Sequence, residues 1–341
     1  MQHIMHDIYK NIYDSNHKIN KISNINVDIQ QNKITNYKFE ERNQFIPEKI
    51  SNWINNNIKY NYYLQYTLNN RNININIYSK NKIVNIKIYF FKILLIINFL
   101  SYYVNDFCSK TLDIKIYLTP FKKNWDNISQ LNEFNVNSGY STIGCIDFSK
   151  LVVFREEEWY KVLIHELMHN FNLDFANVFR EKEKIILKNN FYINSKYDVF
   201  ETYSEFWARQ LNLLIYSFYK VKEKSRFIDF YKIYKNALKK ELAFSLQQAN
   251  KLSAIIYLSD YNEKTNVFSY YVLTSILMYY TEDFILWCKN NNNNLINFKK
   301  NNNNIIKFIK FLIEKYYSNN YYNNLKKSIQ HDNTMQMSII R

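Results

Sequence analysis

The feature that most constrains the fold is a nine-residue stretch in which isoleucine alternates with asparagine. Residues 71–79 run Arg-Asn-Ile-Asn-Ile-Asn-Ile-Tyr-Ser. Successive side chains of a strand point to opposite faces, so this alternation predicts a strand with one apolar and one polar face. Residues 112–120 alternate in the same way, and residues 135–142 and 146–154 predict two further strands. The centre of the chain is therefore expected to build a small sheet.

Helical segments surround these strands. Residues 85–106 predict a helix that is apolar on both sides, between the first two strands, and residues 157–171 predict a helix directly after the last strand. Residues 198–219 predict a long helix, and the remainder to about residue 322 is mainly helical in pattern. We therefore expect an α+β fold, with a small mixed sheet first and a helical half after it.

Domain boundaries follow from shifts in composition. The N-terminal region is polar and rich in Asn, with one helical segment expected near residues 47–58. Loops are expected at the Asn-rich residues 290–294 and 301–304. The expected units are an N-terminal region of unknown role, a catalytic core, a helical C-terminal subdomain and a disordered tail, at residues 1–70, 71–220, 221–327 and 328–341.

The charge balance does not by itself predict a partner. The 341-residue chain carries 45 Lys and Arg against 30 Asp and Glu, a net charge of +15. A basic surface could favour nucleic acid or an anionic membrane. However, the chain contains no dense Lys/Arg block, and Lys is abundant together with Asn, Ile and Tyr, as AT-rich codon usage would produce. We expect no specific nucleic-acid partner.

Two further patterns bear on location. The most apolar run, residues 89–104, is broken by Lys92 and Asn98 and is too short to cross a bilayer core of about 30 Å. Residues 1–20 are polar without the apolar centre of a signal peptide. We expect no transmembrane segment, and a location in the cytoplasm, or in the host-cell cytoplasm if the chain is viral.

The three cysteines stand far apart in the sequence. Cys108, Cys145 and Cys288 form no close pair and no Cys-x-x-Cys motif. The spacing predicts neither a disulfide framework nor a sulfur-ligated metal, and it favours a reducing compartment.

The segment that carries chemistry is His-Glu-Leu-Met-His at residues 165–169. Residues four apart share one face of a helix, so His165 and His169 can direct two imidazoles at one point, as a tetrahedral zinc requires. Glu166 lies about 100° further round the helix, where it can reach a metal-bound water without being a ligand. Apolar neighbours would bury this helix and leave its metal-binding edge facing a cleft. The alternative is two histidines on a helix face with no metal.

A third histidine ligand is not expected. The remaining histidines lie in terminal regions that are expected to be poorly structured: His3, His6, His17 and His331. The extended metzincin motif needs Gly and His where this chain has Asn172 and Phe175. The third ligand should therefore be a carboxylate.

The favoured carboxylates are Glu201 and Glu205, four residues apart in an aromatic-rich helix. Two like charges at this spacing repel each other by a few tenths of a kcal/mol. A metal bound by one of them, with the other accepting the outer N–H of a ligating histidine, would remove that cost. The alternative is an exposed acidic face. Weaker ligand candidates follow the first helix closely or lie in a charged run: Asp174, Glu181 and Glu183.

Both glycines of the chain, Gly139 and Gly144, fall within seven residues of each other. A glycine in a strand permits the close approach of another backbone, such as that of a substrate added to an edge strand. Two ordinary hairpin turns would explain the pair equally well.

A His-Glu-x-x-His zinc site is typical of metallopeptidases. Peptide hydrolysis requires, besides the metal and a base, a donor for the oxyanion. With no histidine left in the core, a tyrosine is expected to serve. The tyrosines proposed are Tyr197, just before the second helix, and Tyr270 or Tyr271 further along the chain.

His165-Glu166-x-x-His169, followed by Glu201-x-x-x-Glu205, resembles the gluzincin metallopeptidases, and the aromatic setting of the second motif resembles their lethal-factor-type branch. The resemblance covers about residues 75–220 and departs from the family at Thr202, where an aromatic residue is usual. It implies a zincin-like domain with an edge strand that docks substrate. It also implies that Glu201 is the third zinc ligand and that Glu205 orients a ligating histidine.

The expected function is a zinc-dependent metallopeptidase, an endopeptidase acting on a peptide or protein substrate. Zn²⁺ would be held by His165, His169 and Glu201, with Glu166 as the general base. One alternative is a zincin-fold protein that binds zinc without proteolysis, although such a site would not need Glu166. Another is a basic nucleic-acid-binding protein with an accidental motif.

Overall fold

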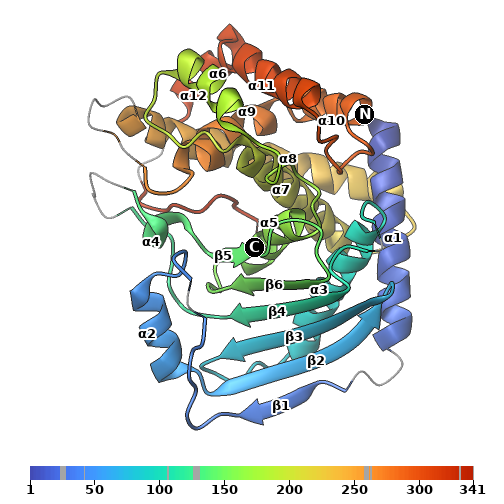
Figure 1. The fold of residues 1–341 in the computed structure, drawn as a ribbon. Coiled ribbons are helices and arrows are strands. Elements are labelled where there is room, and N and C mark those ends of the chain that lie inside the picture. The colour runs from blue at the N-terminus through green and yellow to red at the C-terminus, as the bar shows by residue number, and fades with distance from the viewer. Residues whose placement is uncertain are drawn as a thin grey trace.

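The computed structural model describes residues 1–23, 28–41, 43–105, 107–125, 131–256, 261, 263–329 and 332–340. Within these residues six strands form one mixed sheet, and most of the C-terminal half is helical, which confirms the expected α+β class. In Figure 1 the sheet lies below and the helices of the C-terminal half lie above it. The strands are β1 (Gln30–Lys33), β2 (Tyr60–Leu68), β3 (Arg71–Ser79), β4 (Thr111–Tyr117), β5 (Gly139–Ser141) and β6 (Phe148–Val153).

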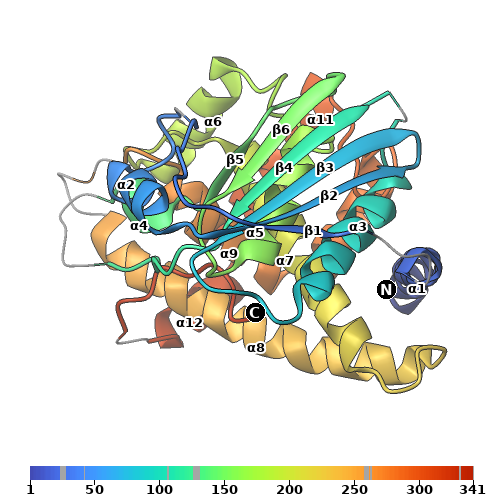
Figure 2. The same ribbon diagram turned by 90° about the horizontal axis from the view of Figure 1, so that it is seen from below.

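The strand order is β1-β2-β3-β4-β6-β5, which Figure 2 shows from below. β2 and β3 form an antiparallel hairpin whose turn residues Asn69 and Asn70 both have positive φ, as a tight hairpin turn requires. β3, β4 and β6 run parallel, whereas β5 runs antiparallel to β6. β5 is therefore the short strand at one edge of the sheet.

The apolar face of β3, which the alternation of residues 71–79 predicts, packs against helices. Ile73, Ile75 and Ile77 are fully buried and share the main core with the apolar helix α3 (Ile86–Ser101), which connects β3 to β4. The opposite face carries a smaller core, where α2 (Glu48–Asn57) packs near Tyr78 and Tyr117. The sheet is therefore covered on both faces.

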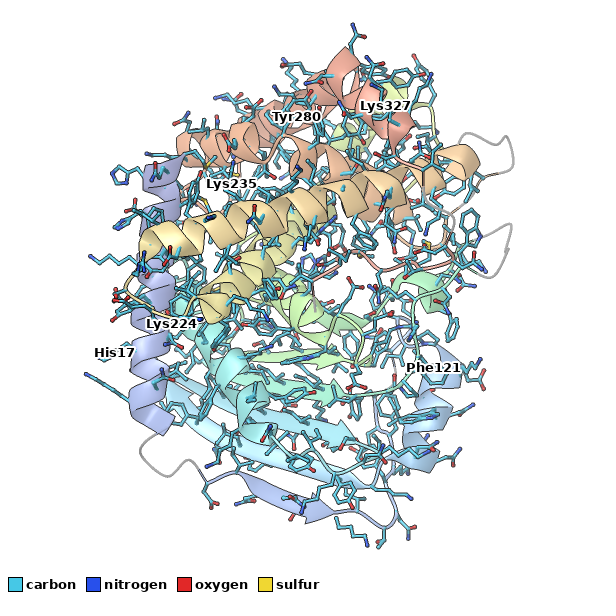
Figure 3. All side chains as sticks on the ribbon, turned by 180° about the vertical axis from the view of Figure 1, so that it is seen from behind. His17, Phe121, Lys224, Lys235, Tyr280 and Lys327 are labelled. Carbon is cyan, nitrogen blue, oxygen red and sulfur yellow. A yellow bond between two sulfur atoms is a disulfide. The ribbon has the colours of Figure 1, made fainter. Side chains whose placement is uncertain are left out.

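The other long helices lie on the face of the sheet that carries the main core, called here the inner face. α7 packs against α5, and α8 packs against α7 and crosses the back of the molecule, as the position of Lys235 in Figure 3 shows. The remaining bounds are α1 (Gln2–Ser23), α4 (Glu133–Val136), α5 (Trp159–Asn170), α6 (Glu181–Phe191), α7 (Val199–Lys220), α8 (Phe227–Ile256), the π-helix η1 (Phe268–Leu273), α9 (Thr274–Tyr279), α10 (Thr281–Asn291), α11 (Asn302–Tyr316) and α12 (Asn319–Lys327).

The expectation for residues 1–70 was wrong, apart from the helix near residues 47–58. The region contributes β1 and β2 to the sheet, and α1 packs on α3, α7 and α8. A boundary at residue 70 would fall within the β2–β3 turn. His3, His6 and His17 lie on α1, and His17 is at the outer edge of the molecule in Figure 3. His331 lies outside the described residues.

The tail was also expected to be disordered, and its described residues 332–340 are not. Met335 is fully buried and Met337 nearly so. The backbone N–H groups of Met337 and Ser338 donate to Glu158 at 3.0 and 2.7 Å, and Ile339 N–H donates to Glu241 at 3.0 Å. The tail therefore forms a packed strap beside α5.

The cysteine expectation was wrong for two of the three residues. Cys108 and Cys145 form a disulfide that joins the segment before β4 to the loop after β5, whereas Cys288 is free and buried. Sequence distance concealed the pair, because neighbouring strands bring the two loops together. Among the described residues, no helix is both long and apolar enough to cross a membrane.

Two smaller expectations also differ from the structure. Residues 135–142 were expected to form one strand, but α4 ends at Val136 and only Gly139–Ser141 form β5. The expected loop at 301–304 is the start of α11, where the Asn301 side chain accepts a hydrogen bond from the Asn304 N–H. Asparagine acts here as a helix cap rather than as a loop residue.

Candidate metal centre

The helix α5 carries the His-Glu-x-x-His motif into the interior. It begins at Trp159, a short loop after β6, and the residue before it, Glu158, has a positive φ of 58°. Every residue from Tyr160 to Asn170 is buried. The motif therefore sits on a fixed helix between the sheet and α7.

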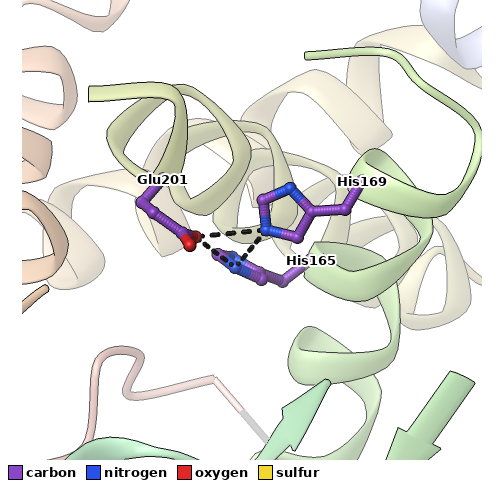
Figure 4. A group of neighbouring side chains, drawn as sticks. All are labelled: His165, His169 and Glu201. Atoms are coloured by element: carbon purple, nitrogen blue, oxygen red, sulfur yellow. Dashed lines mark hydrogen bonds and ion pairs between the residues drawn. The ribbon is translucent and has the colours of Figure 1, made fainter. Parts of the chain in front are cut away.

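Three side chains converge on one point, as Figure 4 shows. The Nε2 atoms of His165 and His169 lie 3.1 Å apart, and each lies 3.1 Å from Oε2 of Glu201 on α7. The three atoms form a nearly equilateral triangle. His165 and His169 are buried, and the Glu201 side chain is 13% exposed.

The donor set fits a metal ion. Neutral imidazole nitrogens and a carboxylate oxygen each present a lone pair to the middle of the triangle. Hydrogen bonds cannot join all three pairs at once, because two Nε2 atoms that both donate to the Glu201 carboxylate cannot also hydrogen-bond to each other. A divalent cation above the triangle would satisfy all three lone pairs together.

Asp174 orients His169. The carboxylate is fully buried and contacts Nδ1 of His169, which leaves Nε2 for the metal. Ser204 Oγ on α7 donates to the same carboxylate oxygen at 3.0 Å, and Ala176 N–H donates to the other at 3.3 Å. Such outer contacts fix the tautomer and direction of a ligating imidazole.

Glu205 has the corresponding position beside His165. Its Oε2 lies 3.0 Å from Nδ1 of His165, although that N–H does not point straight at the oxygen. Lys161, one turn before His165 on α5, holds both carboxylate oxygens of Glu205 at 2.9 and 3.0 Å. A second buried pair, Lys123–Glu158, lies nearby at 2.9 Å. Glu205 is therefore balanced by a lysine on one side and a histidine on the other.

The electrostatics follow from this arrangement. Burial alone would raise the pKa of Glu201, but the charges and hydrogen bonds of His169 and His165 outweigh it and lower that pKa well below its usual range. Burial also opposes ionisation of Glu205, yet Lys161 and His165 lower its pKa to about 2. Burial would lower the pKa of His165 and His169, but their carboxylate partners raise both. Both glutamates are therefore anionic at neutral pH.

Glu166 points to the other side of α5, towards the edge strand. Its Oε2 accepts a hydrogen bond from Ser141 Oγ of β5 at 2.9 Å. Burial raises the pKa of Glu166, against the opposing charges of the two histidines. A side chain at Gly139 would approach Val152 O and Val162 Cγ1 to 2.9 Å and Glu166 Oε1 to 3.1 Å.

The two glycines thus have different roles. Gly139 lets the edge strand approach α5 and Glu166 closely, whereas Gly144 has a φ of 92° and open space around it, as in a turn. Gly139 therefore permits a close approach within the protein itself, and the docking of a substrate backbone there stays a prediction.

A cavity of about 390 Å³ opens beside the triangle. β5 and the residues before it form one wall, and the start of α7 with the loop before η1 forms the other. Met337 of the tail lines its inner end. The motif therefore faces a cleft rather than a closed core.

Of the tyrosines proposed as oxyanion donors, only Tyr270 lies in this cleft, where its ring is 5.8 Å from that of His165. The hydroxyl of Tyr271 donates to Met335 O at 2.5 Å, and that of Tyr197 donates to Ile193 O at 2.5 Å. Neither Tyr197 nor Tyr271 lines the cleft, so the choice of those two residues was wrong. Tyr270 sits on the π-helix η1, a distortion that is frequent at functional sites.

The weaker ligand candidates lie outside the triangle of metal-binding atoms. Asp174 contacts a histidine from outside the triangle, whereas Glu181 and Glu183 lie on α6 and do not line the cleft. Sequence reasoning missed Lys161, whose charge within an otherwise apolar helix face was a usable signal, and Ser141.

Comparison of the chain with protein-family models, with curated proteins and with solved structures finds no match. The geometry of the site is therefore the basis for assigning a function.

Proposed function

We propose that the protein is a zinc-dependent metallopeptidase of gluzincin type. The observation that carries the proposal is the triangle of His165 Nε2, His169 Nε2 and Glu201 Oε2, with Glu166 on the same helix beside an open cleft. Zinc bound at 2.0–2.2 Å by nitrogen and oxygen in a tetrahedron would have donors roughly 3.3–3.6 Å apart. The separations of 3.1 Å are slightly shorter than this range, and a small outward movement of the side chains would admit the ion.

Two histidines and one carboxylate leave one position of a tetrahedron free, as catalytic zinc sites require. Structural zinc sites use four protein ligands, and among the described residues only these three converge. When bound, zinc lowers the pKa of a water molecule toward ~7 and polarises a carbonyl. The open fourth position therefore favours catalysis over a structural role.

The residues around the zinc position divide the remaining tasks. Glu166 accepts the proton of the attacking water and passes it to the leaving amine, a role that its raised pKa suits. Tyr270 is the donor for the developing oxyanion, because it lines the cleft beside His165 and Tyr197 and Tyr271 do not. Asp174 and Glu205 hold the two imidazoles in position.

The substrate backbone would pair with β5. This strand is at the edge of the sheet, its residues 139–141 are partly exposed, and it lines the cleft beside α5. An edge strand offers unpaired backbone groups to an extended peptide. A peptide added there would cross the face of α5 that carries Glu166.

The test compares Glu166→Gln with Glu181→Gln, an exposed glutamate on α6. Protein loaded with zinc is incubated with a denatured protein substrate, and peptide release and zinc content are measured. Glu166→Gln should keep its zinc and lose roughly 10²–10⁴-fold in rate, whereas Glu181→Gln should match the unmodified protein. Equal activity in both variants would contradict the proposal, as would an absence of any zinc-dependent cleavage.

A further inference from the structure

We infer that one end of the cleft is a carboxylate-binding subsite of the substrate, formed by Lys264, Ser138 and their neighbours. This inference rests on the proposed peptidase function and names the substrate chemistry. Thr265 Oγ1 donates to Asn137 Oδ1 at 3.0 Å, and this hydrogen bond joins the loop before η1 to the segment before β5. Lys264 and Ser138 flank that bond, one on each wall, and both line the cleft.

The subsite has unused hydrogen-bonding capacity. Ser138 is only 4% exposed, and its hydroxyl has no hydrogen-bond partner. Asn266 Oδ1 is also buried without a partner, while its Nδ2 faces Glu201 Oε1 at 3.5 Å. A buried polar atom without a partner costs free energy that a bound ligand can recover. Ser138 can donate to a carboxylate, and Asn266 can accept from a backbone N–H.

The charge at this end favours an acid. Lys264 and Lys196 are exposed lysines lining the cleft, and no acid of the described residues forms an ion pair with either. Two other lysines of the lining, Lys123 and Lys161, are already paired. Asp198 is held by Lys184 at 3.0 Å and is also stabilised by the charge of Lys196, and Glu133 is a further acid of the lining. Lys264 is therefore the lysine of this end that remains for a bound carboxylate.

Both walls are held rigid by buried charged groups. Glu263 accepts from Ser195 Oγ at 2.5 Å, Lys196 N–H at 3.1 Å and Phe268 N–H at 2.9 Å, which ties the two lysine-bearing loops together. On the other wall, Arg155 is fully buried and donates to Asn137 O at 3.0 Å. Preorganised groups bind a ligand with less loss of conformational entropy.

The distance of the subsite from the reacting bond follows from Asn266, which contacts Glu201, because Lys264 lies only two residues before Asn266 in the same loop. The bound carboxylate therefore lies within a few residues of the scissile bond. It can come from an Asp or Glu side chain or from the free C-terminus of the substrate. The first source makes the protein an endopeptidase with acidic preference, and the second a peptidase that shortens C-termini.

The test uses fluorogenic peptides of one neutral sequence in which a single Glu is moved along the chain. Each peptide has a Gln counterpart, and each is made with a free and with an amidated C-terminus. In the best position Glu should exceed Gln by about tenfold in kcat/KM, as one hydrogen bond to a charged group allows. A side-chain source produces this preference in both terminal forms. A C-terminal source instead produces a preference for free acid over amide.

Lys264→Ala and Ser138→Ala should each reduce the preference to below about threefold, through KM with kcat nearly unchanged. Lys264→Glu should reverse the preference, so that a peptide with Lys in that position is cleaved faster than the Glu peptide. Lys240→Glu, at an exposed site on α8 outside the cleft, is the matched control and should behave as the unmodified protein. Cleavage that depends on Glu166 but shows neither preference, or a preference unchanged in Lys264→Glu, would overturn the inference. A complete absence of Glu166-dependent cleavage would instead refute the proposed peptidase function.

Discussion

Two clusters of buried polar and charged side chains lie on opposite faces of the sheet, and in both one carboxylate lies between two nitrogen-bearing side chains. On the inner face, Glu205 lies between Lys161 and His165, and all three side chains are at most 8% exposed. On the outer face, Glu41 lies between Lys115 at 2.9 Å and Lys150 at 2.5 Å, and these lysines are 21% and 38% exposed.

The two clusters hold different parts of the protein in place. Glu41 fastens the segment before α2 to β4 and β6, and Tyr140 of β5 also donates to it at 2.8 Å. Glu205 instead contacts the imidazole of His165, one of the three side chains of the candidate metal site, and Lys161 keeps the Glu205 carboxylate ionised. The same type of ion pair therefore fastens a segment to the sheet on one face and supports the candidate metal site on the other.

The largest expected effect is a difference in the free energy of unfolding that is lost when each cluster loses one lysine. Lys161→Met removes the lysine from a fully buried pair and leaves Glu205 poorly compensated, which should cost about 3–5 kcal/mol. Lys115→Met leaves Glu41 paired with the partly exposed Lys150 and should cost about 1 kcal/mol or less. Chemical denaturation of the two variants measures both values. Equal losses would show that the two clusters do not differ as described.

The next effect separates the two glutamates of α7. Glu201→Gln removes a ligand atom, so its zinc affinity should fall by more than about 100-fold. Glu205→Gln removes an outer contact of His165 and should lose about 10–100-fold. Glu41→Gln is the control from the other face and should bind zinc as the unmodified protein does. A zinc titration that ranks Glu205→Gln below Glu201→Gln would reverse the assignment of the third ligand.

The smallest effect concerns acid stability on the outer face. Burial opposes ionisation of Glu41, but Lys150, Lys115 and Tyr140 lower its pKa below the usual value of 4.5. A lowered folded-state pKa stabilises the protein above the unfolded-state pKa, and this contribution is lost as pH falls through the folded-state pKa. Glu41→Gln should therefore be less stable than the unmodified protein at pH 7, by about 1 kcal/mol or less. The difference should shrink as pH falls from the usual value of 4.5 through the lower folded-state pKa. A difference that stays constant throughout this acid titration would show that the Glu41 charge is not its cause.

The sequence predicts features that depend on local spacing. His165, Glu166 and His169 belong to one helix, and the alternation in β3 appears directly in the fold. β2 was missed because its tyrosines lie on both faces of the strand and hide the alternation. α1 did carry a signal, since Ile4, Ile8 and Ile12 recur every four residues and are buried.

The remaining site residues depend on contacts that spacing cannot reveal. Lys161 meets Glu205 across two helices, and Ser141 reaches Glu166 from the edge strand. The tail became ordered because Glu158 and Glu241 accept its backbone N–H groups. Choosing Tyr270 over Tyr271 required the direction of each hydroxyl, and neighbouring residues of a helix point in different directions.

The central claim is that His165, His169 and Glu201 hold one zinc ion, and metal analysis tests it most directly. The full chain is purified, stripped with a chelator, dialysed against zinc and measured beside His165→Ala and His17→Ala, the second being an exposed histidine on α1. The account predicts about one zinc per chain in the unmodified protein and in His17→Ala, and almost none in His165→Ala. A folded, unmodified protein that takes up no zinc would contradict the account, as would a His165→Ala variant that retains a full equivalent.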